Sequence, residues 1–174
     1  MPETYYIDGY NVIHHSTVLR PLLKHSFENA RDALIDKAAR FAIATGLQVK
    51  VVFDGRGRKA ESAAPVLTAP GLEVLYSPHH LTADALIERI VYNSPDRRSI
   101  IVVSADRGIR TLCHTLNALV MDPNNFLASV REKDALTQSI VQNLQKPDSH
   151  GRIEERLDDD TIEKLRKLRD DLKE

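Results

Sequence analysis

The chain has 174 residues, of which 42% are hydrophobic and 28% are charged, and its formal net charge is -1. That length suits one domain with a full core and a short appendage, and no apolar run is long enough to cross a bilayer. The N-terminal residues lack the basic start and apolar stretch of a secretory signal, and Cys113 is the single cysteine. We therefore expect a cytoplasmic protein with no membrane partner. The near-neutral net charge does not exclude nucleic acid, because acidic residues in a site can mask basic ones elsewhere.

Strand-like runs and helical patterns alternate along the chain. Residues 5–8 are aromatic and β-branched and lead into Gly9, which predicts a buried strand that ends in a turn. Apolar residues at helical spacing predict a helix over 29–45, and Gly46 is placed to end it. The continuous apolar run over 49–53 predicts a second buried strand.

The second half continues the alternation. Residues 55–70 are rich in Gly, Pro, Ala and basic residues, and they predict an exposed loop that is a candidate substrate contact. After it we expect strand 72–76, a helix from Thr82 to about residue 93, strand 100–103, helix 107–115, strand 118–121 and helix 126–145. This order predicts an α/β fold with a mainly parallel sheet of about five strands, right-handed crossovers and helices on both faces.

The C-terminal part differs in composition. Residues 146–151 contain Pro and Gly and predict a linker, so we expect one domain over 1–146 and a linker with a charged amphipathic helix over 147–174. The apolar stripe of that helix can dock on the body of the protein or on a partner; it consists of Ile162, Leu165, Leu168 and Leu172. The sequence predicts no oligomeric state.

Five acids fall where an α/β sheet would gather them. Asp8, Asp54 and Asp106 follow predicted strands, and Asp84 and Glu88 lie four residues apart on one helix face. Each alone also fits a structural role, as a turn former or a helix cap. Two like charges 4 Å apart repel by about 4 kcal/mol at an effective dielectric of 20, and a divalent cation would offset that cost. Together the five predict a site of oxygen ligands for Mg²⁺ or Mn²⁺, of the kind used in phosphate chemistry.

Other polar residues are candidates for contact with a phosphate. Asn11 can donate to a phosphate or orient a ligand carboxylate, or it can be a turn residue. The basic side chains nearest the acids are candidate substrate contacts, although solvated surface charge is the alternative; they are Arg56, Arg58, Lys59, Arg107 and Arg110. The pairs His14-His15 and His79-His80 could approach the site but lack zinc spacing. The chain has no nucleophilic triad, P-loop or dinucleotide fingerprint.

The same segments resemble a known family. Tyr6-Ile7-Asp8-Gly9-Tyr10-Asn11-Val12-Ile13, Val51-Val52-Phe53-Asp54, Thr82-Ala83-Asp84 through Glu88, and Val103-Ser104-Ala105-Asp106 resemble the YacP-like NYN domain, part of the PIN-like nucleases. The resemblance covers most of residues 4–145. It implies a Rossmann-like three-layer α/β/α fold and metal-dependent cleavage of RNA, with messenger RNA at the ribosome as the substrate of some members.

The resemblance also implies roles for individual residues. Asp8, Asp84 and Asp106 match the acidic site residues of the family, Asp54 and Glu88 are further matching acids, and Asn11 matches the opening motif. Where some ribosome-associated relatives carry a basic run after the final strand, this chain has Met121-Asp122-Pro123-Asn124-Asn125, which leaves a ribosomal partner doubtful.

The leading hypothesis is a Mg²⁺ or Mn²⁺-dependent endoribonuclease. Asp8 and Asp106 would bind metal directly, Asp84 and Glu88 would complete the site, and Asp54 would orient ligands or water. The main alternative is a PIN-like RNA or ribosome binder with weak or no catalysis. In it the acids are structural, and RNA binding rests on Arg56, Arg58, Lys59 and the 55–70 loop. A metal-dependent phosphatase acting on a small phosphorylated molecule is a third hypothesis.

Overall fold

The structure is a computed structural model that describes residues 3–55 and 66–145. It contains two compact units, Met1–Thr137 and Gln138–Glu174, and the site described below lies in the first. Arg56, Arg58, Lys59, the predicted linker and the predicted C-terminal helix lie outside the described residues. Within the described residues, no helix is long and apolar enough to span a membrane.

A six-stranded sheet with the order β3-β4-β2-β1-β5-β6 forms the centre of the first unit. Five strands are parallel, as the alternation of elements predicted, and their bounds are Thr4–Asp8 (β1), Gln48–Phe53 (β2), Leu72–Tyr76 (β4), Ile100–Val103 (β5) and Leu119–Met121 (β6). The sixth, β3 (Val66–Ala69), pairs antiparallel with β4 at the sheet edge. Because β2 and β5 lie on opposite sides of β1, the strand order reverses at β1, and ligands bind beyond the carboxyl ends of strands at such a point.

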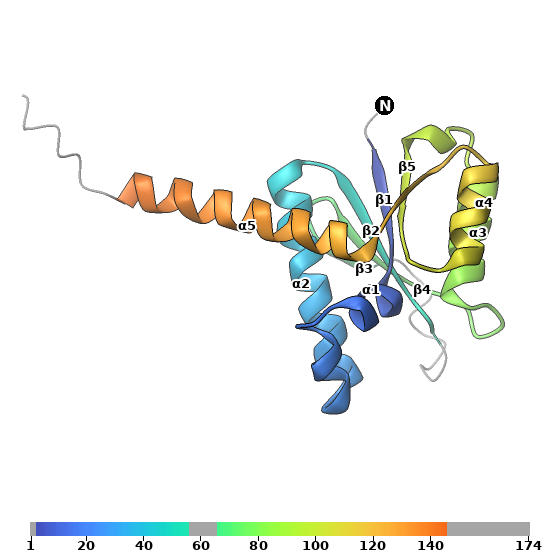
Figure 1. Cartoon of the computed structure of the whole chain (residues 1–174), viewed down its shortest axis with the longest axis horizontal. Coiled ribbons are helices and arrows are strands. Elements are labelled where there is room, and N and C mark those ends of the chain that lie inside the picture. Colours follow the sequence, from blue (N-terminus) through green and yellow to red (C-terminus); the bar gives the residue numbers. More distant parts are fainter. Residues whose placement is uncertain (1–2, 56–65, 146–174) are drawn as a thin grey trace, which may run out of the picture. The chain divides into compact units, whose positions relative to one another are not determined.

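Helices cover both faces of this sheet, giving the expected three layers (Figure 1). On one face lie α1 (Gly9–His15), α2 (Phe27–Thr45) and the first turns of α5 (Pro123–Gln145); on the other lie α3 (Ala83–Asn93) and α4 (Arg107–Thr115). The crossover through α2, from β1 to β2, and the crossover through α3, from β4 to β5, run in opposite directions across the sheet. Because both crossovers are right-handed, α2 and α3 lie on opposite faces. Two short 3₁₀ helices, Arg20–Lys24 and Arg97–Ser99, complete the connections.

The helix ends follow local chemistry that the sequence displays. The Ser26 hydroxyl accepts hydrogen bonds from two backbone amides at the start of α2, and Gly46, with a φ of 69°, ends that helix. Thr82 Oγ1 accepts from Ala85 N at 3.1 Å and begins α3 at the predicted position. The Thr82 cap fixes where α3 begins, and the first turn of α3 carries Asp84 to the carboxyl ends of the strands.

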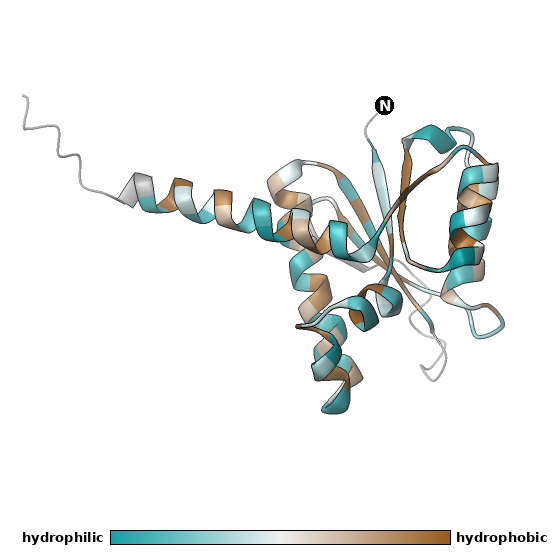
Figure 2. Ribbon diagram, viewed as in Figure 1, coloured by the Kyte–Doolittle hydropathy of each residue, from teal (hydrophilic) through white to brown (hydrophobic). Residues whose placement is uncertain are grey.

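Two buried clusters pack the helices onto the sheet. In the cluster beneath α2, the Tyr5, Phe41 and Phe126 rings meet edge to face with successive centroid separations of 5.4 Å. The cluster beneath α3 and α4 includes Ile87, Val91 and the buried Cys113. Figure 2 shows the hydrophobic colour concentrated on the strands between helices that alternate between hydrophilic and hydrophobic residues. The sheet edge that carries the acids is therefore held rigidly from both sides.

Two sequence expectations are corrected by the fold. The turn expected at Gly9 is instead the first residue of α1, because Asp8 accepts from Asn11 N and caps a helix that starts directly after the strand. The loop expected over residues 55–70 contains β3, because the hairpin closed by Gly71, with a φ of 78°, returns this segment to pair with β4. Both wrong predictions involve glycines that were interpreted only as residues that end a secondary-structure element.

Gly9 is also a packing requirement, which gives a first prediction. A Cβ atom on Gly9 would lie 2.3 Å from Cε1 of Phe53, a fully buried ring that cannot move aside. We expect Gly9→Ala to destabilise the protein by about 1–3 kcal/mol, the usual cost of overpacking a core. Urea unfolding of the variant and the wild type would measure this difference.

Gly108→Ala is the matched control, because Gly108 also lies in the first turn of a helix and its Cβ would meet only the Asp106 carboxylate, at 3.1 Å. We expect that control to stay within about 0.5 kcal/mol of the wild type, the usual range for substitutions away from core packing. Equal stability of both variants would contradict the proposed contact between Gly9 and Phe53.

Candidate active site

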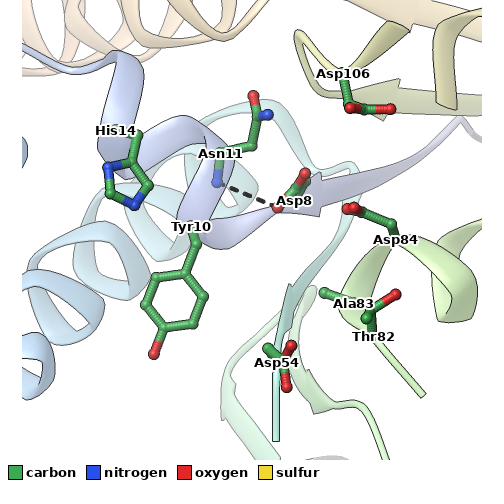
Figure 3. A pocket seen from close by; sticks show the side chains of 9 residues that line it. All are labelled: Asp8, Tyr10, Asn11, His14, Asp54, Thr82, Ala83, Asp84 and Asp106. Atoms are coloured by element: carbon green, nitrogen blue, oxygen red, sulfur yellow. Dashed lines mark hydrogen bonds between the residues drawn. The ribbon is translucent and has the colours of Figure 1, made fainter. Parts of the chain in front are cut away.

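A cavity of about 290 Å³ lies at the carboxyl ends of β1, β2 and β5. Four of the five predicted acids line it, namely Asp8, Asp54, Asp84 and Asp106. They come from four separate segments of the chain, and Figure 3 shows the Asp8 and Asp84 carboxylates directed toward each other. The structure therefore brings together at one sheet edge the acids that the strand ends predicted.

Asp8 is the most constrained of these acids. It is the last residue of β1 and the N-cap of α1, and its side chain is only 4% exposed. Its Oδ1 accepts from Asn11 N at 3.2 Å, and its Oδ2 accepts from the Ser104 hydroxyl at 3.1 Å. These two bonds fix the orientation of the Asp8 carboxyl from two different strand ends.

Ser104 and Asn11 connect the β1 end to the β5 end. The Ser104 hydroxyl, fully buried, also accepts from Asp106 N at 3.1 Å, and Asn11 Oδ1 accepts from Ala105 N at 2.9 Å. Asp106 in turn caps α4, with Oδ1 accepting from Ile109 N at 3.0 Å. Ser104 thus supports both Asp8 and Asp106, and Asn11 holds the backbone that carries Asp106.

The other two acids come from the α3 and β2 ends. Asp84 lies in the first turn of α3, two residues after the Thr82 cap, and its side chain is exposed at the rim of the cavity. Asp54 follows β2 at a strand end where Gly55 N donates to Ser77 Oγ at 3.1 Å and Ser77 N donates to Phe53 O at 2.9 Å. Hydrogen bonds of the neighbouring backbone thus place Asp54 at the same edge.

The acids influence one another electrostatically. Burial raises the pKa of Asp8 to about 6, and the negative charge of Asp84 adds to that rise, while the bonds from Asn11 N and Ser104 oppose it. The pKa of Asp84 is raised first by partial burial and then by the charges of Asp106 and Asp54, while a hydrogen bond from Asp8 lowers it. Asp84 thus interacts with the other three carboxylates, and a proton on Asp8 forms a hydrogen bond to Asp84.

The donor set is of the kind that a hard divalent cation prefers. The carboxylates supply only oxygen atoms, and the single histidine in the cavity, His14, has no thiolate or second imidazole beside it among the lining residues. As the side chains stand in the described residues, no three His, Cys, Asp or Glu groups are close enough to hold a metal ion. A bound cation would require rotation of side chains, which Asp84 and Asp106 can undergo because both are exposed.

The remaining predicted residues lie at different distances from the cavity. Asn11 lines it, whereas Glu88, one turn beyond Asp84 on α3, lines a neighbouring groove together with Arg107. Arg110 is exposed in the middle of α4 and lines neither hollow. The roles predicted for Glu88, Arg107 and Arg110 stay predictions, as do those of Arg56, Arg58 and Lys59, which lie outside the described residues.

Two lining residues, Tyr10 and His14, received no definite role from the sequence. They lie four residues apart on α1 and so share one face of that helix, and both line the cavity. Because the sequence predicted a turn after Asp8, it offered no helix face on which to place them. A helix beginning at Gly9 is the signal that would have identified both.

Comparison with known proteins extends these observations. A family model described as the YacP-like NYN domain matches residues 5–170 of the chain. The chain belongs to the YacP-like NYN domain family. The resemblance inferred from the acidic motifs is thereby confirmed.

The chain is similar to proteins of Bacillus subtilis. A protein described as uncharacterized protein YacP of Bacillus subtilis (strain 168) is 39% identical over 84 residues, which is 48% of each chain, so the matched segment spans about half of that relative. The crystal structure of Rae1 (YacP) from Bacillus subtilis superposes with a TM-score of 0.69 at 26% identity, covering 96% of this chain and 94% of that one. A point variant of Rae1 gives a TM-score of 0.69 at 27% identity over 84% and 86% of the two chains. The three-layer fold is thus shared with a solved YacP structure.

Proposed function

We propose that this protein is an endoribonuclease that hydrolyses phosphodiester bonds of RNA, messenger RNA among them, with Mg²⁺ or Mn²⁺ as its cofactor. The observation that carries the proposal is the convergence of four carboxylates from separate segments on one cavity, with the pKa of Asp8 raised to about 6. Burying a charged Asp8 beside Asp84 is costly in a protein without a cation, with burial as the larger part of that cost, and a divalent ion would relieve it. Membership of a PIN-like nuclease family supports the same chemistry.

Asp8, Asp84 and Asp106 are the residues that would hold the cation, with Asp54 at its margin. When bound, the ion would lower the pKa of a water molecule and neutralise charge on the scissile phosphate. Ser104 and the backbone amide of Asn11 hold the Asp8 carboxyl in one orientation, so that only the exposed Asp84 and Asp106 side chains would have to rotate to meet the cation. The exposed Arg107, next to Asp106, is suited to contact a phosphate oxygen.

The shape of the site favours a polymer over a small phosphorylated molecule. Asp84 and Asp106 are exposed at the rim of the cavity, so a chain can pass across the acids without being enclosed. A phosphatase for small molecules would bury most of its ligand in a closed pocket. This accessibility is the reason for preferring RNA as the substrate class.

The test is cleavage of a fluorescently labelled single-stranded RNA by the purified full-length chain. We expect cleavage in Mg²⁺ or Mn²⁺, a loss of at least about a hundredfold in excess EDTA, and recovery on adding back metal in excess of the chelator. Undiminished cleavage in EDTA would refute the cofactor. RNA binding without cleavage in any divalent metal would indicate an RNA-binding protein, and turnover of a small phosphomonoester alone would indicate a phosphatase.

A further inference from the structure

A second hollow, of about 630 Å³, lies between α3 and α4 beside the acidic cavity. The side chains of Leu112 and Leu116 give it apolar walls, and Glu88, Tyr92 and Arg107 contribute its polar and aromatic parts. The volume falls within the range of about 300–1,000 Å³ that is typical of small-molecule pockets. We call this hollow the α3/α4 groove.

Residues of α3 and residues at the start of α4 line both the groove and the acidic cavity. Helix α3 presents Asp84 to the cavity and Glu88, one helical turn further on, to the groove. On α4, Asp106 lines the cavity and Gly108 lines the groove, and a Cβ on Gly108 would lie 3.1 Å from Asp106 Oδ1. A chain lying across the acids can therefore enter the groove directly, past a residue that has no side chain.

Tyr92 offers an exposed aromatic ring in the groove. Its side chain is 63% exposed, and the guanidinium of Arg97 lies 5.9 Å from the ring centroid. Arg97 is itself fixed, because its Nη2 donates to Tyr92 O at 2.7 Å and its Nε donates to Val91 O at 3.2 Å. Because most of Tyr92 is exposed, a nucleobase can stack on its ring.

Glu88 supplies an acceptor to the same groove. Its side chain lies against α4, since its charge adds to burial in raising the pKa of Cys113 to about 11. An ionised carboxylate only accepts hydrogen bonds, and carboxylates accept from the N4 amino group of cytosine. The corresponding edge of uracil carries a carbonyl oxygen at that position, which a carboxylate repels.

We propose that the α3/α4 groove binds one nucleobase of single-stranded RNA beside the scissile phosphate, with Tyr92 as the stacking surface and Glu88 as the acceptor that selects cytosine over uracil. The inference rests on the proposed ribonuclease activity and deepens it. It also gives Glu88 a role in specificity that differs from the ligand role expected from its sequence position. Arg107, exposed between the two hollows, contacts the phosphate that joins them.

The test uses labelled RNA oligonucleotides that differ only in having cytosine or uracil at each position flanking the cleavage site. We expect the wild type to prefer cytosine about tenfold at one position, the discrimination expected of one good base contact. Glu88→Gln should lower that ratio toward one, because Gln can donate to the uracil oxygen. Tyr92→Ala should weaken oligonucleotide binding about tenfold, with Tyr92→Phe restoring it.

Ile43→Ala is the matched control for Tyr92→Ala, because Ile43 is also 63% exposed but lies on α2, across the sheet. This control should keep the wild-type preference and affinity. An equal loss of cleavage on both oligonucleotides in Glu88→Gln, with weaker activation by Mn²⁺, would assign Glu88 to the metal site and overturn the inference.

Fluorescence anisotropy of the same oligonucleotides separates the two proposals, because it measures the groove whether or not RNA is cut. Absence of cleavage in the wild type would refute the ribonuclease while a weakened Tyr92→Ala complex would still support the groove. Unchanged binding by Tyr92→Ala, in a protein that cleaves RNA, would refute the groove alone.

Discussion

Replacing Asp8 by Asn is expected to lower RNA cleavage by about a hundredfold or more, since even residues that only support metal ligands cost 10–100-fold when they are lost. Asn retains an oxygen that can accept from the Asn11 amide, but it removes the negative charge at the buried centre of the four acids. The variant should therefore fold and bind RNA while losing turnover. Initial rates of oligonucleotide cleavage at saturating Mn²⁺ would measure the effect.

Asp32→Asn is the matched control for this experiment. Asp32 is an exposed acid on α2, on the face of the sheet opposite α3 and α4, so the same chemical change should leave cleavage at the wild-type rate. Wild-type activity in Asp8→Asn would refute the assignment of the site. A loss of RNA binding together with cleavage would show instead that Asp8 acts by shaping the RNA surface.

The fold and the centre of the site could be predicted because both follow from strand order. Asp8, Asp54 and Asp106 each end a continuous apolar run, and parallel strands bring such ends to one edge whatever their distance along the chain. Thr82 and Gly46 mark helix ends through local hydrogen bonding and backbone conformation, which residue type alone reveals.

The margins of the site could not be predicted because they depend on contacts between segments. Phe53, from a distant strand, packs so closely against Gly9 that only glycine fits at the start of α1. The sequence instead predicted a turn there, and therefore no helix face for Tyr10 and His14. Glu88 shares a helix face with Asp84, as spacing predicts, yet the position of α4 places it in a different hollow. Helical spacing predicts which residues share a face, but the packing of the next helix determines what that face adjoins.

The stability of the metal-free protein is expected to fall as pH rises from 4 to 7.5, and Asp8 is the main reason. Its pKa is about 6 in the folded protein and 3.8 for an aspartate exposed to water, so the folded state holds the proton more tightly. The stability gained from that proton is full below pH 3.8 and is lost as pH rises through 6. A separation of this size corresponds to about 3 kcal/mol, and the carboxyl is buried enough for the conversion to apply.

Asp8→Asn should remove this penalty, because its uncharged amide can donate to Asp84 as the protonated acid does, but its nitrogen cannot accept from the Ser104 hydroxyl, a loss that applies at every pH. In EDTA the stability of the variant relative to the wild type should therefore rise by up to about 3 kcal/mol, or about 6–12 °C in Tm, between pH 4 and pH 7.5. Urea unfolding at both pH values would measure it, with Asp32→Asn as the control that shows no pH-dependent difference.

Saturating Mn²⁺ should stabilise the wild type more than the variant, because the cation replaces the proton as the partner of the acids. A difference between wild type and variant that is the same at pH 4 and pH 7.5 would mean that burial and the charge of Asp84 do not raise the pKa of Asp8.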